Sequence, residues 1–430
     1  MASAAALGQS GFQVDLFEAR GFLGGRAASY PVPGDAASVS SEVIDNCQHV
    51  LLRCCVNLMD FYGRLGVANR IEFHKQFFFL EPGGRMSVLQ AGRLPAPLHF
   101  TASFWDLKFL ELRDKFAIAR ALWAIRREHR KRQDLDRISM LQWLQEKRQT
   151  ERAIQRFWNQ VLVSAINEDL DRMAASHGFQ VFWLGFLARA NSYEMGIPAV
   201  PLGDLYGPEG WRRIPNVRLH ARTPVECVLA DGSAVRGVVA GGDRQSADYY
   251  VSALPFERLT AVIPALQLNL RGFEHSPITG IHLWFDRSIT ELPHATLLDR
   301  TVQWMFNKWE GRYLQLVVSA SRSLVEMPRP EVIALALREL AEFFPRVKEA
   351  KLEKAHVVKE IRATFSAQPG LEQARPPSAT GFGNLFLAGD WTRSGWPPIM
   401  EGAVRSGYLA AEGVTRAAGQ ERKFLLPDLA

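Results

Sequence analysis

Two short blocks near the N-terminus carry residues that could bind a dinucleotide. The run Val14–Glu18 has the pattern of a strand that ends in a carboxylate. In a dinucleotide-binding fold, such a carboxylate accepts hydrogen bonds from ribose hydroxyls. Gly24, Gly25 and Arg26 follow, and glycines let the backbone approach a pyrophosphate while arginine supplies a fixed fork of donors. Together the blocks predict an adenosine and pyrophosphate site, although each alone would also fit a surface turn.

A third block near the C-terminus has related chemistry. An apolar strand ends at Gly389 and Asp390, the place where ligands collect in open α/β sheets. Two prolines then precede a helix whose first turn carries Met400, Glu401 and Gly402. The N-terminus of a helix stabilises negative charge, such as that of a reduced flavin ring. A β–turn–α unit without a ligand would have the same pattern.

The elements that must position these blocks lie in three separated stretches, near residues 1–50, 217–255 and 380–418. Helical patterns dominate the sequence between the first two, and antiparallel strand patterns lie between the last two. We therefore predict an α/β fold, with a discontinuous Rossmann-like domain and an inserted α+β substrate domain. The predicted boundaries are 1–70, 216–260 and 376–430 for the Rossmann-like domain, and 71–215 (largely helical) and 261–375 (antiparallel sheet plus helices) for the substrate domain.

Local patterns give sharper expectations at three places. Residues 76–89 predict a hairpin that turns at Pro82-Gly83-Gly84. Residues 43–65 show apolar side chains at helical spacing, which predicts a helix. Residues 107–132 predict an amphipathic helix with a basic end.

The composition is that of an ordinary globular protein. The chain has 430 residues, of which 47% are hydrophobic and 22% charged, with a formal net charge of +6. This charge permits contact with anionic lipid or a phosphorylated ligand, but no nucleic-acid-binding motif is present. The four cysteines lack zinc-ligand spacing, so we expect no metal site and a reducing, cytoplasmic environment. We find no secretory signal and no run long enough to span a membrane.

Two longer blocks carry a resemblance to a known family. They are IDNCQHVLL, from Ile44 to Leu52, and AGDWTRSGWPPIMEGAVRSG, from Ala388 to Gly407. With the three blocks above, they resemble the FAD-dependent superfamily of amine oxidases, phytoene desaturases and protoporphyrinogen oxidases. Within it, the chain is most similar to the hydroxysqualene dehydroxylases of squalene and hopanoid biosynthesis. The resemblance spans almost the whole chain.

The resemblance implies FAD as the cofactor and assigns residues to it. Those residues are Glu18 at the adenosine ribose with Arg20 beside it, Gly24, Gly25 and Arg26 along the pyrophosphate and ribityl chain, Cys227 or Val228 at the adenine, Gly389 and Asp390 at the ribityl chain or pyrophosphate, and Met400, Glu401 and Gly402 at the isoalloxazine ring. The family's GxGxxG loop is expected about 20 residues before the acidic residue. Counting back from Glu18 runs off the chain, so we expect the first strand and this loop to be missing, with a gap in the sheet and weakened FAD binding.

The reaction implied by the resemblance is the reduction of hydroxysqualene to squalene. Loss of the hydroxyl as water gives a delocalised cation, and reduced flavin delivers hydride to it. A proton donor is needed for the leaving water, and the candidates are Asp45, His49 and Glu194. Each also has an ordinary interpretation: a helix cap for Asp45, a hydrogen bond to backbone or cofactor for His49, and a solvated loop position for Glu194.

An apolar isoprenoid substrate requires a long apolar pocket. Three stripes could line it, Phe77–Leu80, Phe179–Leu187 and Ile281–Trp284, although core packing explains each equally well.

Peripheral contact with the inner face of the cell membrane is a further expectation. Apolar residues precede the basic segment 126–132, a pattern typical of a helix that lies in the membrane interface. A packed helix with a solvated basic end fits equally well. The apolar residues concerned are Phe100, Phe104, Trp105, Phe109 and Leu110.

Three other functions stay open on the sequence: a carotenoid-type desaturase, an amine oxidase, and a non-catalytic prenyl-lipid-binding protein of the same superfamily. Glu18, Arg26 and Asp390 favour a flavin enzyme, whereas the missing glycine loop favours the binding protein.

Overall fold

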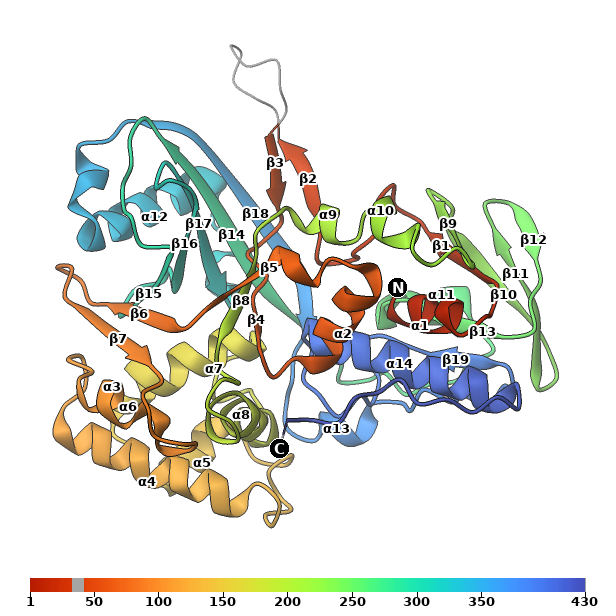
Figure 1. Cartoon of the computed structure of the whole chain (residues 1–430), viewed down its shortest axis with the longest axis horizontal. Helices are drawn as coiled ribbons and strands as arrows, with labels where there is room; N and C mark the ends of the chain where they lie inside the picture. The colour runs from red at the N-terminus through yellow and green to blue at the C-terminus, as the bar shows by residue number, and fades with distance from the viewer. Residues whose placement is uncertain (33–41, 430) are drawn as a thin grey trace.

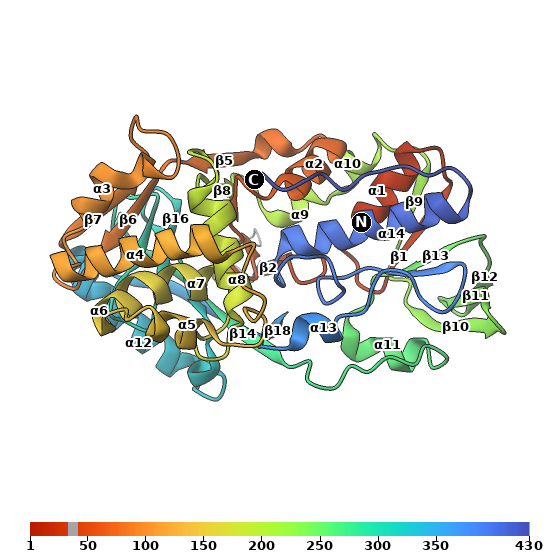
Figure 2. The same cartoon turned by 90° about the horizontal axis from the view of Figure 1, so that it is seen from below.

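The computed structural model describes residues 1–32 and 42–429. It has two parts that lie side by side, and helices α4 to α8 belong to the part that lies away from β10 to β12 (Figures 1 and 2). The mixed α/β fold predicted from the sequence is confirmed. The division into domains stays a prediction, although the three separated stretches do come together in one of the two parts.

The part that gathers those stretches contains two parallel strand pairs and one antiparallel sheet. The parallel pairs are β1 (Val14–Glu18) with β9 (Val217–Ala221), and β13 (Tyr250–Ser252) with β19 (Leu385–Leu387). The antiparallel sheet is β10 (Val225–Asp231), β11 (Ala234–Ala240) and β12 (Asp243–Gln245). Among the described residues the two parallel pairs share no ladder.

Helices α1 (Ala2–Gln9) and α14 (Met400–Ala417) pack against one another beside these strands. A Cβ added at Gly407 would lie 3.0 Å from the Cβ of Ala2, so glycine at this position permits the close approach. Helix α2 (Val56–Leu65) joins the same core and ends at Gly66, whose φ of 72° is the left-handed conformation that glycine adopts readily.

The other part is built on a seven-stranded sheet of order β18-β14-β17-β16-β15-β6-β7. Its strands are β6 (Gln76–Leu80), β7 (Met86–Gln90), β14 (His275–Phe285), β15 (His294–Leu297), β16 (Trp304–Trp309), β17 (Tyr313–Ser319) and β18 (Leu352–Phe365). One face packs on helix α12 (Arg329–Phe343). The other face packs on helices that include α4 (Leu112–Glu128), α7 (Asn159–Ile166) and α8 (Ala175–Phe182).

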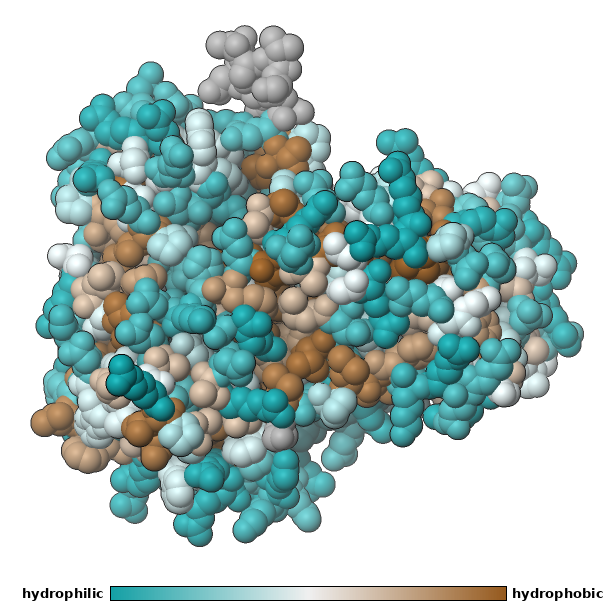
Figure 3. Space-filling view, viewed as in Figure 1, coloured by the Kyte–Doolittle hydropathy of each residue, from teal (hydrophilic) through white to brown (hydrophobic). Residues whose placement is uncertain are grey.

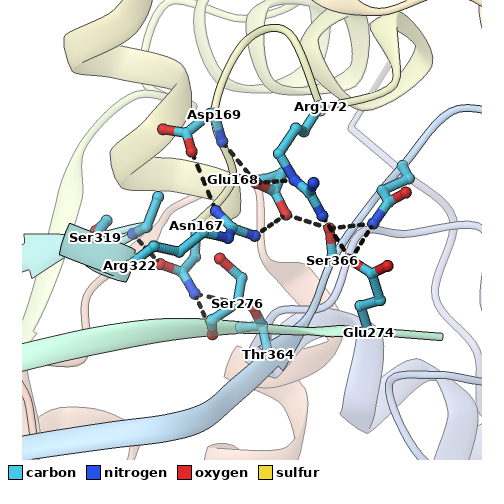
Figure 4. A network of polar contacts seen from close by, with 12 residues as sticks. Asn167, Glu168, Asp169, Arg172, Glu274, Ser276, Ser319, Arg322, Thr364 and Ser366 are labelled. Carbon is cyan, nitrogen blue, oxygen red and sulfur yellow. Dashed lines mark hydrogen bonds and ion pairs between the residues drawn. The ribbon is translucent and has the colours of Figure 1, made fainter. Parts of the chain in front are cut away.

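A buried polar network fixes the end of α7 to this sheet (Figure 4). Asn167, in the left-handed conformation, donates to the Ser276 carbonyl at 3.0 Å and accepts from the Ala320 N–H at 2.7 Å. Glu168 is fully buried, pairs with Arg322 at 2.7 Å and accepts a hydrogen bond from Ser366. Because a buried carboxylate is stable only when it is paired, this network holds the helical layer in one position over the sheet.

Of the three elements predicted from local patterns, two are confirmed and one is wrong in part. The hairpin is confirmed as β6 and β7, and the amphipathic helix is confirmed as α4. The helix predicted over residues 43–65 is wrong in its first half, where the chain forms β3 (Glu42–Asp45) and β4 (Leu51–Leu52) before α2 begins at Val56. Strand β3 pairs with β2 (Ser29–Val32), and β4 pairs with β8 (Met195–Pro198). Pairing with these other segments overrides the local spacing.

Candidate functional site

An ion pair joins the second and third sequence blocks. A guanidinium nitrogen of Arg26 lies 2.5 Å from Oδ1 of Asp390, and another donates to the Ala363 carbonyl at 3.1 Å. Burial alone would lower the pKa of Arg26, but the neighbouring Asp390 carboxylate outweighs this and the pKa is raised. Two residues that are 364 positions apart in the sequence thus form one charged unit at the junction of the two parts.

The turn before Arg26 requires its glycines. Gly24 has a φ of 117°, and a Cβ there would collide with the Ala27 carbonyl oxygen. Gly25 has a φ of 62°, and nothing lies within 4 Å of the position that a Cβ would take. Arg20 donates to the Gly25 carbonyl at 3.2 Å, which ties the turn to the end of β1. The turn therefore presents bare backbone beside a cation, as the binding of a pyrophosphate requires.

Glu18 stands at the carboxyl end of β1, as the sequence predicted. One carboxylate oxygen accepts from the Arg20 N–H at 2.9 Å, and within the described residues the other accepts no hydrogen bond. The Glu18 carbonyl accepts from the Thr223 N–H at 2.9 Å. This contact brings the start of β10, with the half-buried residues Cys227 and Val228, to the same end of the strand pair as the carboxylate. A free carboxylate oxygen in this position can accept from ribose hydroxyls.

The Gly389 turn begins the third block. Gly389 has a φ of 132° and donates its N–H to the Ser406 hydroxyl of α14 at 2.8 Å. At Gly402, in the first turn of that helix, a Cβ would lie 2.5 Å from the Pro397 carbonyl oxygen. Met400 is half-buried in the same turn. These close approaches fix the N-terminus of α14 beside Asp390.

The Glu401 side chain has a different partner from the one the sequence suggested. Its carboxylate is fully buried and accepts from the N–H groups of Asn57 at 3.2 Å and Leu58 at 2.7 Å, and from the Asn57 amide at 2.8 Å. Burial raises its pKa, although these hydrogen bonds oppose that rise. Glu401 therefore caps helix α2, which leaves only its backbone for contact with a cofactor.

Arg375 is a structural residue of the site that the sequence did not reveal. Its side chain is 1% exposed and donates to the carbonyls of Asp390, Thr392 and Trp396. It also pairs with Glu372 at 2.5 Å. The residue fixes the whole loop that follows β19. Its only sequence signal is a lone arginine before two prolines, which is too common to single it out.

These residues fit FAD. The site offers an acidic acceptor at a strand end, a glycine turn in the left-handed region, the half-buried cation of Arg26 and a helix N-terminus. Those groups match, in order, the ribose, the pyrophosphate and its charge, and a negatively charged ring.

The three proton-donor candidates are all engaged with the protein. Asp45 Oδ1 accepts from the Ser29 hydroxyl at 2.6 Å and from the Leu202 N–H at 2.9 Å. Glu194 pairs with Arg53 at 2.7 Å. His49 Nδ1 lies 2.9 Å from the Cys47 carbonyl, and burial lowers its pKa. A neutral imidazole is a poor acid at neutral pH, so this geometry favours His49 as a hydrogen-bonding residue.

Two of the three predicted pocket stripes meet in the structure. Phe77 of β6 and Phe186, just after α8, have ring centroids 6.4 Å apart, and Phe77 also contacts Trp304 at 6.3 Å. The first and third stripes are each wrong in part, because Phe78 and Leu80 of the first, like Ile281 and Leu283 of the third, point to the opposite face of the sheet and pack on the α12 side. Side chains alternate along a strand, so a four-residue stripe cannot line one wall.

The apolar residues predicted to reach a membrane are mostly buried. Phe104, Phe109 and Leu110 are between 1% and 9% exposed, Phe100 is half-buried, and Trp105 is 37% exposed. Instead, the outer side of α4 exposes three large apolar residues at helical spacing, Leu112, Phe116 and Trp123. Figure 3 shows apolar surface among polar surface over the region of α3 (Thr101–Trp105) and α4.

Comparisons with known proteins agree with this site. The family model described as "Flavin containing amine oxidoreductase" matches residues 1–415. The chain is 25% identical to 15-cis-phytoene desaturase of Synechococcus elongatus, covering 95% of this chain and 92% of that protein. It is 24% identical to zeta-carotene desaturase of Synechocystis sp., covering 96% and 94%. A crystal structure of an oxidoreductase from Methanosarcina mazei superimposes with a TM-score of 0.70 at 15% identity, covering 94% and 96%.

Proposed function

Since the chain belongs to the family of flavin containing amine oxidoreductases and its cofactor is FAD, we propose that it is an oxidoreductase of a long isoprenoid, and that its reaction is the reduction of hydroxysqualene to squalene. The observation that carries the flavin part is the Arg26–Asp390 pair beside the left-handed glycine turn. The similarity to two carotenoid desaturases, and the aromatic wall around Phe77, support an apolar isoprenoid as substrate.

In the proposed reaction the carbon–oxygen bond breaks, the hydroxyl leaves as water after taking up a proton, and a hydride replaces it. When reduced, FAD supplies that hydride, and an external two-electron donor restores the reduced form. The chain's own residues bind the cofactor, orient the isoprenoid and exclude water from the reacting carbon.

The test is product analysis with the FAD-loaded protein. Under anaerobic conditions with dithionite as reductant, hydroxysqualene should disappear and squalene should form in equal amount. An Asp390→Asn variant should retain less FAD and form less squalene in proportion, because the Arg26 side chain loses its charged partner. Unchanged hydroxysqualene with a fully loaded, reducible protein would contradict the proposed reaction.

Carotenoid desaturation is the second candidate, and the two desaturase relatives favour it. That reaction removes hydrogen from the substrate and needs oxidised flavin. Incubation of the oxidised, FAD-loaded protein with phytoene separates the two candidates. Only a desaturase extends the conjugated double bonds of phytoene and so forms products that absorb at longer wavelengths.

We further propose that the outer side of α4 contacts the membrane in which such a substrate dissolves. Leu112, Phe116 and Trp123 are 68%, 64% and 55% exposed. Arg126 lies over the Trp123 ring at 5.3 Å, and the exposed basic residues Arg127, Arg130 and Lys131 follow. Apolar side chains flanked by cations suit the interface of an anionic bilayer. Among the described residues, none of the helices has the length and apolar character needed to cross a bilayer.

A Leu112→Ser/Phe116→Ser variant should co-sediment less with anionic vesicles than the unmodified protein. The matched control is Trp309→Ser, which removes a side chain of similar exposure, 56%, from strand β16. Equal sedimentation of both variants and the unmodified protein would exclude α4 as the contact.

A further inference from the structure

One face of the seven-stranded sheet carries buried polar side chains that nothing in the described protein satisfies. His282, Gln315 and His294 are each 0% exposed. The unpaired atoms are Nε2 of His282, both amide atoms of Gln315 and both ring nitrogens of His294. Thr296 Oγ1, on the same face, is also unpaired.

Strand register places the three residues in one row. His282 of β14 lies opposite Gln315 of β17, Gln315 lies opposite Phe306 of β16, and Phe306 lies opposite His294 of β15. Directly opposite residues have Cβ atoms about 5 Å apart, so His282 and Gln315 can contact one small group together. His294 lies two strands beyond Gln315, too far to share that group.

The His282 end of the row borders the proposed flavin site. His282 Nδ1 lies 2.7 Å from the Tyr313 hydroxyl, which leaves Nε2 on the side of Gly280. A Cβ at Gly280 would lie 3.6 Å from His282 Nε2 and 2.8 Å from the Asn46 carbonyl oxygen. The Asn46 amide in turn donates to the Arg26 carbonyl at 2.8 Å. Gly280 and Asn46 thus lie between Arg26 and the unpaired Nε2 of His282.

The histidines of the row are neutral at pH 7. Burial, with smaller contributions from His356 and Lys308, lowers the pKa of His282 to about 3. Burial likewise lowers the pKa of His294 to about 3. Neutral imidazole and amide groups that stay unpaired lose their hydration without compensation. Their presence on this face is explained if a ligand supplies the missing hydrogen bonds.

We propose that Gln315 and His282 bind a hydroxyl group of the substrate. A hydroxyl donates one hydrogen bond and accepts others, and the Gln315 amide offers both an acceptor and a donor while His282 Nε2 offers a third contact. A hydrocarbon leaves all three atoms unpaired. The site therefore selects an isoprenoid alcohol over an isoprenoid hydrocarbon of the same length. This inference rests on the proposed function, because it assumes that the apolar wall around Phe77 holds an isoprenoid.

The test measures the equilibrium binding of hydroxysqualene and of squalene to the FAD-loaded full chain, with tryptophan fluorescence as the signal. The unmodified protein should bind the alcohol about tenfold to a hundredfold more tightly than the hydrocarbon, which is the effect of one or two buried hydrogen bonds. Gln315→Met should bring this ratio close to one by weakening only the alcohol. Gln315→Leu is a second variant should the first fail to fold.

Thr296→Val is the matched control. This substitution removes another unpaired buried polar atom on the same face of the sheet, but one that lies beside the row and not in it. It should leave the ratio of alcohol to hydrocarbon affinity unchanged. A preserved ratio in the Gln315 variants, or no preference in the unmodified protein, would overturn the inference and leave the proposed function standing. Absence of binding of either lipid by the unmodified protein would instead overturn the proposed function.

Discussion

Leu316 and Gln315 are neighbours on strand β17, both are fully buried, and they point to opposite faces of one sheet. On the Leu316 side, the sheet packs on α12 through apolar residues, among them Ile281, Leu283 and Leu314, and the buried hydroxyl of Thr279 on this face is hydrogen-bonded to Ser321 at 2.9 Å. On the Gln315 side, the row of His282, Gln315, Phe306 and His294 holds polar atoms for which the described residues supply no partner: His282 Nε2, both amide atoms of Gln315 and both ring nitrogens of His294. Leu316 and Gln315 are both 0% exposed, so solvent exposure does not explain the difference in polarity between the two faces.

The comparison separates stability from function within one element. A face that serves only packing gains stability from apolar contacts and from pairing the polar groups it does bury, as the α12 face does with Thr279. A face that keeps unpaired polar groups gives up some stability in return for contacts that form only with a ligand. The two faces should therefore respond in opposite directions to the same kind of substitution.

The largest expected effect comes from exchanging the two side-chain types. Leu316→Gln places an amide in the α12 core and should lower the free energy of unfolding by about 3–5 kcal/mol. Gln315→Leu removes an unpaired amide and should leave that free energy unchanged or raise it by up to about 1 kcal/mol. Urea unfolding at pH 7.5 measures both. A similar loss in the two variants would show that the Gln315 amide is satisfied in solution and that the faces do not differ.

The second expected effect is a pH dependence of the free energy of unfolding that originates in two histidines on the Gln315 face of the sheet. In the folded state the pKa values of His282 and His294 are about 3, below the value of about 6.5 in an unfolded chain. The unfolded state therefore binds protons first, and stability falls as pH decreases from about 6.5 towards 3. Each histidine should contribute a loss of about 1.4 kcal/mol between pH 7.5 and pH 5.5.

His294→Phe isolates one of these contributions. The variant should lose about 1.4 kcal/mol less than the unmodified protein over the same pH interval, as measured by urea unfolding at the two pH values. His177, whose pKa burial also lowers to about 3, is unchanged in both proteins and cancels. An identical pH dependence would mean that His294 is already protonated or solvated in the folded state.

Much of the geometry of the proposed nucleotide-binding site was predictable because its signals are local. Gly24, Gly25 and Arg26 form the expected turn, and Arg26 and Asp390 come from the two blocks that the sequence singled out. Strand ends and glycine turns depend on neighbouring residues, so their patterns persist in the sequence. The pairing of Arg26 with Asp390 itself was not predictable, since it depends on how distant strands are ordered.

The functions of Glu401 and Gln315 depend on such distant contacts. Glu401 caps a helix that begins 345 positions earlier, at Val56, and nothing near residue 401 indicates that helix. Gln315 interrupts the apolar run Tyr313–Ser319, which is a signal in the sequence but does not say which face of the strand is unpaired. Only the register with His282 shows that two polar groups meet.

The smallest expected effect tests the hydrogen bond that the His282 side chain makes with Tyr313, the one it forms among the described residues. Tyr313→Phe removes the hydroxyl that lies 2.7 Å from His282 Nδ1 and keeps the ring that stacks on Trp284 at 4.4 Å. The free energy of unfolding should fall by about 1 kcal/mol. In a His282→Leu background the same substitution should have no effect, because the partner is already absent. Equal losses in both backgrounds would assign the Tyr313 hydroxyl to another partner, and His282 would then be free to turn away from Gln315.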